Sequence, residues 1–349
     1  MSSCKRRDDR RMEDSQPVEI AYDLVPFTDA IRDAYLELLP DQGQAIAAGK
    51  LEWKFRDNPA GTGMVAIARA DGEIIGVNGF MPSRFMLGER EARAYQSMDT
   101  IVAPAARGKG VFPALLKCFY ERTDGALIYG FPNASSSPGF FGKLGWSRFG
   151  PVPMLFRPLR TGYFLKRFGR LMPDVRVPIL SRPLRDFERI ARFDETATAA
   201  WRSFSTGIAC ALDRDADFLN WRLADHPAEE YDILRAPDGS FTVHSVSDKH
   251  GGRIGYLMEA IGTGATLAPL ISASLRDMAA SGADAALAWC LPGSPNYAAH
   301  RKAGFYPLPP KLRPVVINFG ARPLRSEAGM DAITDPRGWY VSYLDSDTV

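Results

Sequence analysis

The chain has 349 residues, of which 46% are hydrophobic and 24% charged, with a formal net charge of +2. This composition is typical of a globular protein with a sizeable core and excludes a disordered or fibrous chain, and the length predicts two domains. The charge balance gives no indication of nucleic-acid binding, and no apolar run approaches the roughly 20 residues that a membrane-spanning helix needs.

The first 17 residues are polar and mixed in charge, and we expect them to form a disordered lead-in. Basic residues at positions 5–7 are not followed by an apolar run, so the segment does not resemble a secretory signal. The cysteines and histidines are scattered, without the spacing of a metal site or a disulfide framework: Cys4, Cys118, Cys210, Cys290, His226, His244, His250 and His300. We therefore expect no bound metal and a cytoplasmic location.

The sequence contains an internal repeat. Residues 51–59 read L-E-W-K-F-R-D-N-P, and residues 219–227 read L-N-W-R-L-A-D-H-P. An Asp-Gly pair follows each copy, at 71–72 and at 238–239, in a pattern that predicts a β-hairpin. The alternative is that two unrelated helices both contain Trp and Pro.

A second pair of segments follows in the same order and at a similar offset. Residues 141–146 read F-G-K-L-G-W, and residues 300–305 read H-R-K-A-G-F. Matching order and spacing favour a true duplication, which is the pattern of a protein built from repeated units.

A glycine-rich turn, Arg107-Gly108-Lys109-Gly110, lies between a predicted strand at 97–102 and a predicted helix that begins near Val111. Helix N-termini carry unpaired N–H groups and positive potential, and glycines let a ligand approach the backbone closely. The turn therefore predicts an anion site, although many surface turns look similar.

The order of these motifs resembles the GNAT superfamily of acyl-CoA N-acyltransferases. The matching residues are R-G-K-G-V-F at 107–112, Y-G-F-P-N at 129–133 and F-F-G-K-L-G-W at 140–146, within a strong region of resemblance at 51–146. The chain is most similar to bacterial GNAT proteins, many of them encoded among cell-surface polysaccharide genes. The resemblance implies that the turn holds the pyrophosphate of coenzyme A.

The expected fold is α/β, with two tandem GNAT-like units that each contain a mixed, twisted sheet flanked by helices. We expect the acyl-CoA-binding N-terminal unit at 18–156, a basic Arg/Pro-rich connector at 157–195, a degenerate second unit at 196–322 and a C-terminal tail at 323–349. The second unit's loop, residues 261–266, keeps glycines but lacks arginine and lysine. We therefore predict that this unit is structural or shapes the acceptor pocket.

The segment 155–193 is strongly basic and carries interleaved apolar residues: Tyr163, Phe164, Phe168, Leu171 and Met172. Such a pattern is found in elements that touch an anionic membrane surface or an anionic substrate. A connector with surface arginines and aromatic residues packed on two domains explains it more simply, and we favour that interpretation.

The resemblance implies acetyl-CoA, or another acyl-CoA, as co-substrate. The residues expected to contact it are Ile101, Val102, Ala103, Arg107, Gly108, Lys109, Gly110, Val111, Phe112, Asn133 and Phe141. Asp99 is the candidate general base, with a turn-capping or arginine-paired carboxylate as the alternative. Strict alternation would place Asp99 and Ile101 on one face of the strand, opposite Met98, Thr100 and Val102.

One position departs from the family pattern. The family's usual tyrosine, a proton donor, is replaced by Phe141, so the thiolate leaves unaided or Tyr129 or Ser137 assists. Asn133 either bonds the pantetheine arm or is a turn residue. Trp53 could stack on a sugar, but its repetition as Trp221 favours a core role.

The predicted function is acyl transfer from acyl-CoA to an amine of a small-molecule acceptor; from the resemblance, that acceptor would be an amino sugar. Two alternatives remain: a non-catalytic acyl-CoA-binding or scaffold protein, and an aminoacyl-tRNA-dependent transferase. The second alternative needs a broad basic RNA-binding surface, for which only 155–193 is a candidate, so we expect no nucleic acid partner. The sequence does not indicate an oligomeric state.

Overall fold

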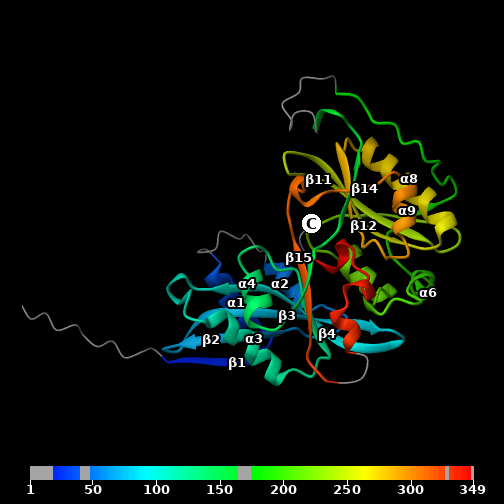
Figure 1. Cartoon of the computed structure of the whole chain (residues 1–349). Coiled ribbons are helices and arrows are strands. Elements are labelled where there is room, and N and C mark those ends of the chain that lie inside the picture. Colours follow the sequence, from blue (N-terminus) through cyan, green and yellow to red (C-terminus); the bar gives the residue numbers. More distant parts are fainter. Residues whose placement is uncertain (1–18, 40–47, 164–173, 327–329, 347–349) are drawn as a thin grey trace, which may run out of the picture.

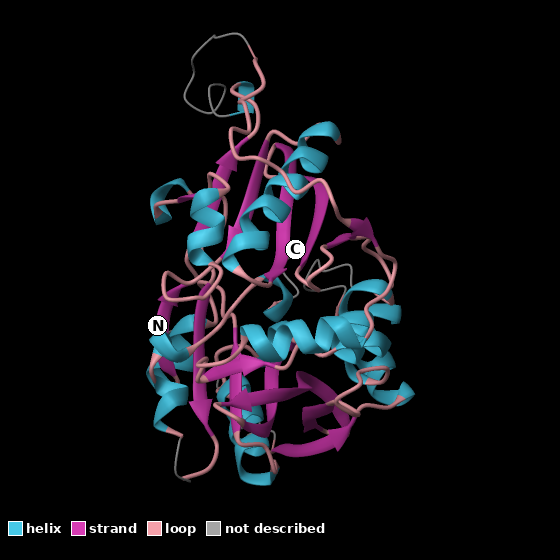
Figure 2. Cartoon of the chain, turned by 90° about the vertical axis from the view of Figure 1, so that its right-hand side faces the viewer, coloured by secondary structure: helices cyan, strands magenta, loops and turns pink. Residues whose placement is uncertain are grey.

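A computed structural model describes residues 19–39, 48–163, 174–326 and 330–346, so the predicted lead-in lies outside the described residues. The described chain forms two mixed β-sheets flanked by helices, one in each lobe of the molecule (Figure 1; Figure 2). The predicted α/β class with mixed, helix-flanked sheets is confirmed.

The first sheet has the order β1-β2-β3-β4-β5-β15-β6, with β9 added beside β3. Its only parallel pair among the described strands is β4 with β5; the others are antiparallel. The strands are β1 (Ile20–Pro26), β2 (Met64–Ala70), β3 (Glu73–Leu87), β4 (Arg90–Val102), β5 (Leu127–Gly130), β6 (Ser147–Pro151), β9 (Cys210–Leu212) and β15 (Asn318–Pro323).

The second sheet has the order β14-β7-β13-β12-β11-β10-β8. Within the described part of the chain, its parallel pair is β12 with β13, which corresponds to β4 with β5 in the first sheet. The strands are β7 (Met154–Pro158), β8 (Glu188–Arg189), β10 (Asp232–Arg235), β11 (Phe241–Lys249), β12 (Gly252–Ile261), β13 (Ala285–Trp289) and β14 (Tyr306–Pro307).

Helices flank both sheets, and capping residues help to set where they begin. Thr28 caps α1 by accepting a hydrogen bond from the Ile31 amide, and α3 begins at Val111, as predicted. The helices are α1 (Asp29–Leu38), α2 (Ala48–Phe55), α3 (Val111–Arg122), α4 (Ser137–Lys143), α6 (Glu195–Phe204), α7 (Ala216–Leu219), α8 (Gly264–Ala280), α9 (Tyr297–Lys302) and α10 (Asp331–Thr334), and a π-helical turn (Asn220–Ala224) continues α7. No helix in the described ranges is long and apolar enough to cross a membrane.

Both predicted hairpins are present. Residues 71–72 join β2 to β3, and residues 238–239 lie between β10 and β11. Asp71, Gly72 and Gly239 adopt positive φ, which Gly and Asp tolerate better than other residues.

The two sheets exchange strands, a feature that the sequence analysis did not anticipate. β7 lies at the end of the first unit in sequence but pairs with β13 and β14 of the second sheet. Conversely, β15 leaves the second unit and inserts between β5 and β6 of the first sheet, visible as the orange strand that joins the lobes in Figure 1. Each sheet is therefore completed by a strand from the other unit.

The repeated tryptophans lie at the junction of the two units. The Trp53 and Trp221 rings stack with centroids 4.7 Å apart. Each indole Nε1 donates to the other's main-chain carbonyl oxygen, at 2.9 and 3.0 Å. Both side chains are buried, so the core role expected for Trp53 is confirmed and the repeat pairs with itself.

The connector expected at 157–195 contributes to the second sheet. Its first residues belong to β7, and residues 188–189 form β8 at the opposite edge. Tyr163 donates a hydrogen bond to the His250 carbonyl. Phe164, Phe168, Leu171 and Met172, on which the membrane alternative depended, lie outside the described residues.

The C-terminal segment (residues 330–346) is packed between the two lobes, where it appears red in Figure 1. Trp339, Tyr340, Tyr343 and Leu344 are at most 4% exposed. The sequence had suggested only a tail here; the structure buries it in the core that joins the two sheets.

A buried charge cluster fixes this segment to the second sheet. Arg214 is fully buried and donates to the carboxylates of Glu259 at 2.7 Å and Asp345 at 2.6 Å. Tyr340 donates to Glu259 Oε1, and Ser342 donates to Oε2, which also accepts from Arg214. Burial raises the pKa of the Asp345 carboxyl, and the charge of Arg214 opposes that rise.

Arg214→Met should lower the free energy of unfolding by about 3 to 5 kcal/mol, because it leaves two carboxylates buried without a cation. Urea denaturation at equilibrium measures the change. Arg337→Met is the control, since Arg337 is exposed and pairs with Asp335 at the surface. Equal stability of the Arg214 variant and the control would contradict this role for the cluster.

Candidate active site

The first sheet opens between β4 and β5. These strands pair only at Ala94–Gln96 with Leu127–Tyr129, whereas β4 stays paired with β3 as far as Val102. Beyond Gln96, β4 and β5 therefore diverge, and the described strands place no neighbour beside this edge of β4. A cavity of about 220 Å³ lies at this opening.

A β-bulge shapes β4 inside the opening. Val77 pairs with Ile101 and Gly79 with Met98, so two residues, Asp99 and Thr100, oppose one residue on β3. Asp99 has φ +49°, which is uncommon for a residue with a side chain.

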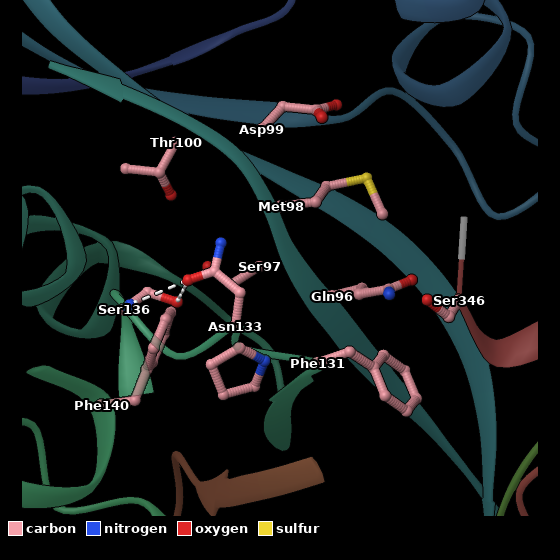
Figure 3. A pocket seen from close by; sticks show the side chains of 11 residues that line it. Gln96, Ser97, Met98, Asp99, Thr100, Phe131, Asn133, Ser136, Phe140 and Ser346 are labelled. Atoms are coloured by element: carbon pink, nitrogen blue, oxygen red, sulfur yellow. Dashed lines mark hydrogen bonds between the residues drawn. The ribbon is translucent and has the colours of Figure 1, made fainter. Parts of the chain in front are cut away.

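The bulge makes the predicted alternation wrong. Met98 and Ile101 both pack into the core that joins the two units, while Val102 packs on the opposite side, against the α3 cluster. One extra residue reverses the side-chain order beyond it. Met98 and Asp99 consequently point to the same side in Figure 3, away from Asn133.

Asp99 is held by a lysine that the sequence analysis missed. Lys54 Nζ on α2 lies 3.0 Å from Asp99 Oδ2, and the two side chains are 6% and 12% exposed. A pair this enclosed is screened little by solvent, so the ammonium group neutralises the carboxylate and fixes its direction. The repeat offered a signal, since a cation follows Trp in both copies, at Lys54 and Arg222.

The predicted anion loop lies at the other end of the opening. Gly108 and Gly110 have φ +78° and +80°, and Gly110 is the N-cap of α3. A second cavity of about 340 Å³ is lined here by both glycines and by Arg107, Phe112 and Lys143, among others. Helix N–H groups and two cationic side chains thus surround one space, which suits a phosphate.

The remaining loop and strand-end residues have structural contacts of their own. Arg107 Nε donates to the Val102 carbonyl at 3.1 Å, and the Ala103 amide donates to Ile75 at 2.9 Å. Val111 is buried under the loop, and Lys109 is exposed. The loop is therefore tied to the end of β4.

Asn133 lies across the cavity from β4. Its Oδ1 accepts hydrogen bonds from the Ser135 and Ser136 amides, both at 3.0 Å. This is the turn role that the sequence left open. In Figure 3 the side-chain nitrogen of Asn133 points towards the β4 side of the cavity. The turn therefore fixes the Asn133 side chain through its oxygen and leaves the nitrogen facing the cavity.

The two neighbouring phenylalanines of α4, Phe140 and Phe141, have different surroundings. Phe140 lines the cavity, whereas Phe141 lies under the Arg148 guanidinium and against Gly320 of β15. Tyr129, a suggested proton donor, is buried against Ser83, and burial raises its pKa. The hydroxyl groups that line the cavity belong to Ser97, Thr100, Ser136 and Ser346.

The cavity has two sides in Figure 3. Thr100, Asn133, Ser136 and Phe140 gather on one side, and Met98, Asp99, Gln96, Phe131 and Ser346 gather on the other. Ser346 comes from the C-terminal segment, which the sequence analysis did not connect with the site. No cluster of metal-ligating side chains occurs among the residues that the structure describes.

The corresponding opening in the second sheet is filled. β12 and β13 pair only over Ile254–Leu257 and Ala285–Ala288. Beyond that, Tyr340 donates to Glu259 on β12, and Asn296 Nδ2 donates to the Tyr340 hydroxyl at 3.0 Å and to the Ala260 carbonyl at 2.9 Å. Burial raises the pKa of Tyr340, so its hydroxyl stays a donor.

Comparison with known proteins agrees with this geometry. Residues 23–149 match the Acetyltransferase (GNAT) domain family. No curated protein matches the sequence significantly.

Solved structures resemble the chain over most of its length. A GCN5-related N-acetyltransferase from Anabaena variabilis has a TM-score of 0.63 at 10% identity, covering 88% of this chain and 73% of that one. A GCN5-related N-acetyltransferase from Kribbella flavida has a TM-score of 0.56 at 16% identity, with coverage of 87% and 72%. Saccharomyces cerevisiae N-myristoyltransferase, solved with bound myristoyl-CoA, has a TM-score of 0.56 at 11% identity, with coverage of 87% and 80%.

The matched region, residues 23–149, contains the diverging strands β4 and β5, the bulge at Asp99 and the loop at the start of α3. Residues 23–149 therefore match a GNAT acetyltransferase domain, and the two-sheet fold of the chain is similar to that of these transferases.

Proposed function

We propose that the protein transfers an acyl group, most simply acetyl, from acyl-CoA to the amine of a small polar acceptor in the cytoplasm. The observation that carries this proposal is the divergence of β4 from β5 beyond Gln96, with a cavity at Asp99 and a second cavity at the cationic loop that begins α3. An extended pantetheine arm can pair with such an edge as an added strand.

The loop would hold the donor. Backbone N–H groups of residues 108–112 would meet the pyrophosphate, with Arg107 and Lys143 supplying charge. Asn133, fixed by its turn, would offer its amide nitrogen to the pantetheine arm. Holding the thioester in this way removes much of the entropic cost of the reaction.

The chemistry then needs one base. The acceptor nitrogen attacks the thioester carbonyl carbon, the C–S bond breaks, and the amine loses a proton to Asp99 directly or through a water. Residues that line the cavity next to Asp99 offer no tyrosine or histidine as acid. A thiol pKa near ~8.5 makes thiolate departure feasible without one.

The cavity walls suit a hydroxyl-bearing amine. Neutral hydrogen-bonding groups predominate beside Asp99, including Gln96, Ser346 and Ser97. An amino sugar has this chemistry, and we propose it as the acceptor class.

The absence of a tyrosine among the cavity-lining residues also favours a second candidate function, a protein that binds acyl-CoA without turnover. Measuring the release of coenzyme A thiol with a panel of amines separates the two functions.

Asp99→Asn should lower turnover by about 10²- to 10⁴-fold, since amide cannot accept the proton, with acetyl-CoA affinity nearly unchanged. Steady-state thiol release and calorimetric titration provide the two measurements. Asp71→Asn is a matched control, because Asp71 has a similar positive φ, +51°, but is exposed in a hairpin turn. Unchanged turnover in Asp99→Asn would remove Asp99 from the mechanism.

Arg107→Met should weaken acetyl-CoA binding about tenfold, because one charged contact to the pyrophosphate is lost. The loss should shrink as ionic strength rises, since the side chain is exposed. Arg122→Met, at the far end of the same helix and paired with Asp23, should bind normally. Equal affinities for the two variants at low salt would refute the loop as the pyrophosphate site.

Titration with acetyl-CoA should give one bound molecule per chain. The second opening is occupied by Tyr340, and an added Cβ at Gly262 in its loop would lie 2.1 Å from Ser240 Oγ, which shows how closely that loop is packed. Isothermal calorimetry measures the stoichiometry. Two molecules per chain would contradict the assignment of donor binding to the first unit alone.

A further inference from the structure

Two buried cations occupy the same position of the repeat. Lys54 and Arg222 each follow one tryptophan of the Trp53–Trp221 pair, whose backbone carbonyls and indoles are bonded reciprocally across 168 residues. Lys54 reaches Asp99, a wall residue of the first unit's cavity. Arg222 reaches a different wall of the same cavity.

Arg222 is 4% exposed and bonds the end of the C-terminal segment. Its Nε donates to the Leu344 carbonyl at 3.3 Å, and its Nη2 donates to the Ser346 carbonyl at 2.6 Å. Its guanidinium lies 5.5 Å from the Trp53 ring centroid. A guanidinium is suited to this task because its rigid fork can hold two oxygens at once.

Ser346 is where this contact meets the site. It lines the cavity together with Gln96 and Phe131, on the same side as Asp99 in Figure 3. The preceding residues are already fixed to the second sheet through Tyr340 and Asp345. Arg222 therefore holds the part of the C-terminal segment that forms the cavity wall, through the carbonyls of Leu344 and Ser346.

We propose that Arg222 is a positioning residue for the acceptor: it holds Leu344–Ser346 as the acceptor-side wall of the cavity, so that acceptor affinity depends on the unit that holds no acyl-CoA. This inference rests on the proposed function. The segment that it holds places Ser346 in the cavity wall, beside Gln96 of β4, so these neutral side chains line this side of the cavity. It therefore recognises the hydroxyl groups of a small amine rather than a carboxylate or phosphate.

The test compares wild type with Arg222→Met and Arg222→Lys, using acetyl-CoA and D-glucosamine as the probe amine, by thiol release. Arg222→Met should raise the KM for glucosamine about tenfold while the KM for acetyl-CoA stays within about twofold. Arg222→Lys keeps the charge but loses the fork, and should recover part of the affinity. Arg192→Met is the control, since Arg192 is exposed and pairs with Asp225 near the same π-helical turn.

A parallel rise in both KM values, or a fall in kcat alone, would overturn the inference, because either would indicate a general structural defect. Hydrogen exchange adds a readout that needs no substrate. The amides of residues 344–346 are hydrogen-bonded in the folded chain, and they should exchange faster in Arg222→Met while residues 108–112 do not change.

Unchanged exchange at 344–346 would overturn the role of Arg222 by itself. If Arg222→Met shows the expected faster exchange but wild type turns over no amine, the proposed function fails while the anchoring by Arg222 stands. If Arg222→Met does not fold, as judged by its thermal midpoint, Arg222→Lys takes its place in the same measurements. The amides of residues 344–346 should then exchange faster in Arg222→Lys than in wild type.

Discussion

The reciprocal exchange of β7 and β15 is the constraint on which the rest of the structure depends. β15 pairs with β5 along its free side, so β5 is held in the first sheet although β4 diverges from it after Gln96. β7 does the same for β13 in the second sheet. Each opening thus exists because the partner unit completes the sheet around it, and neither unit is a self-contained domain in the usual sense.

The two openings differ in what occupies them. In the first, the edge of β4 faces a cavity, and the loop keeps its arginine. In the second, the C-terminal segment fills the space, and Glu259, held by Arg214, bonds Tyr340 there. The segment that fills the second opening ends at Ser346, in the wall of the first. In the proposed function, the first opening holds the site and the second unit supports it.

Local features of this chain could be predicted from sequence because short-range chemistry determines them. The Asp-Gly hairpins, the start of α3 at Val111 and the burial of Trp53 follow from turn preferences, helix termini and the repeat. The strand exchange could not be predicted, since pairing between segments as far apart in the chain as Met154 and Trp289, or Leu127 and Pro323, leaves no local pattern. The bulge at Asp99 is a single extra residue in β4, and that residue reversed the predicted side-chain order. Lys54 and Ser346 reach the site only through tertiary contacts; the repeat marked Lys54 as a cation that follows Trp in both copies, and nothing in the sequence marked Ser346.

The structure of the protein bound to coenzyme A tests the central claim most directly. The account predicts one coenzyme per chain, with its pyrophosphate on the N–H groups of residues 108–112 and its pantetheine arm along β4 beyond Gln96. A coenzyme bound at residues 262–267, or one that leaves the opening between β4 and β5 empty, would contradict it.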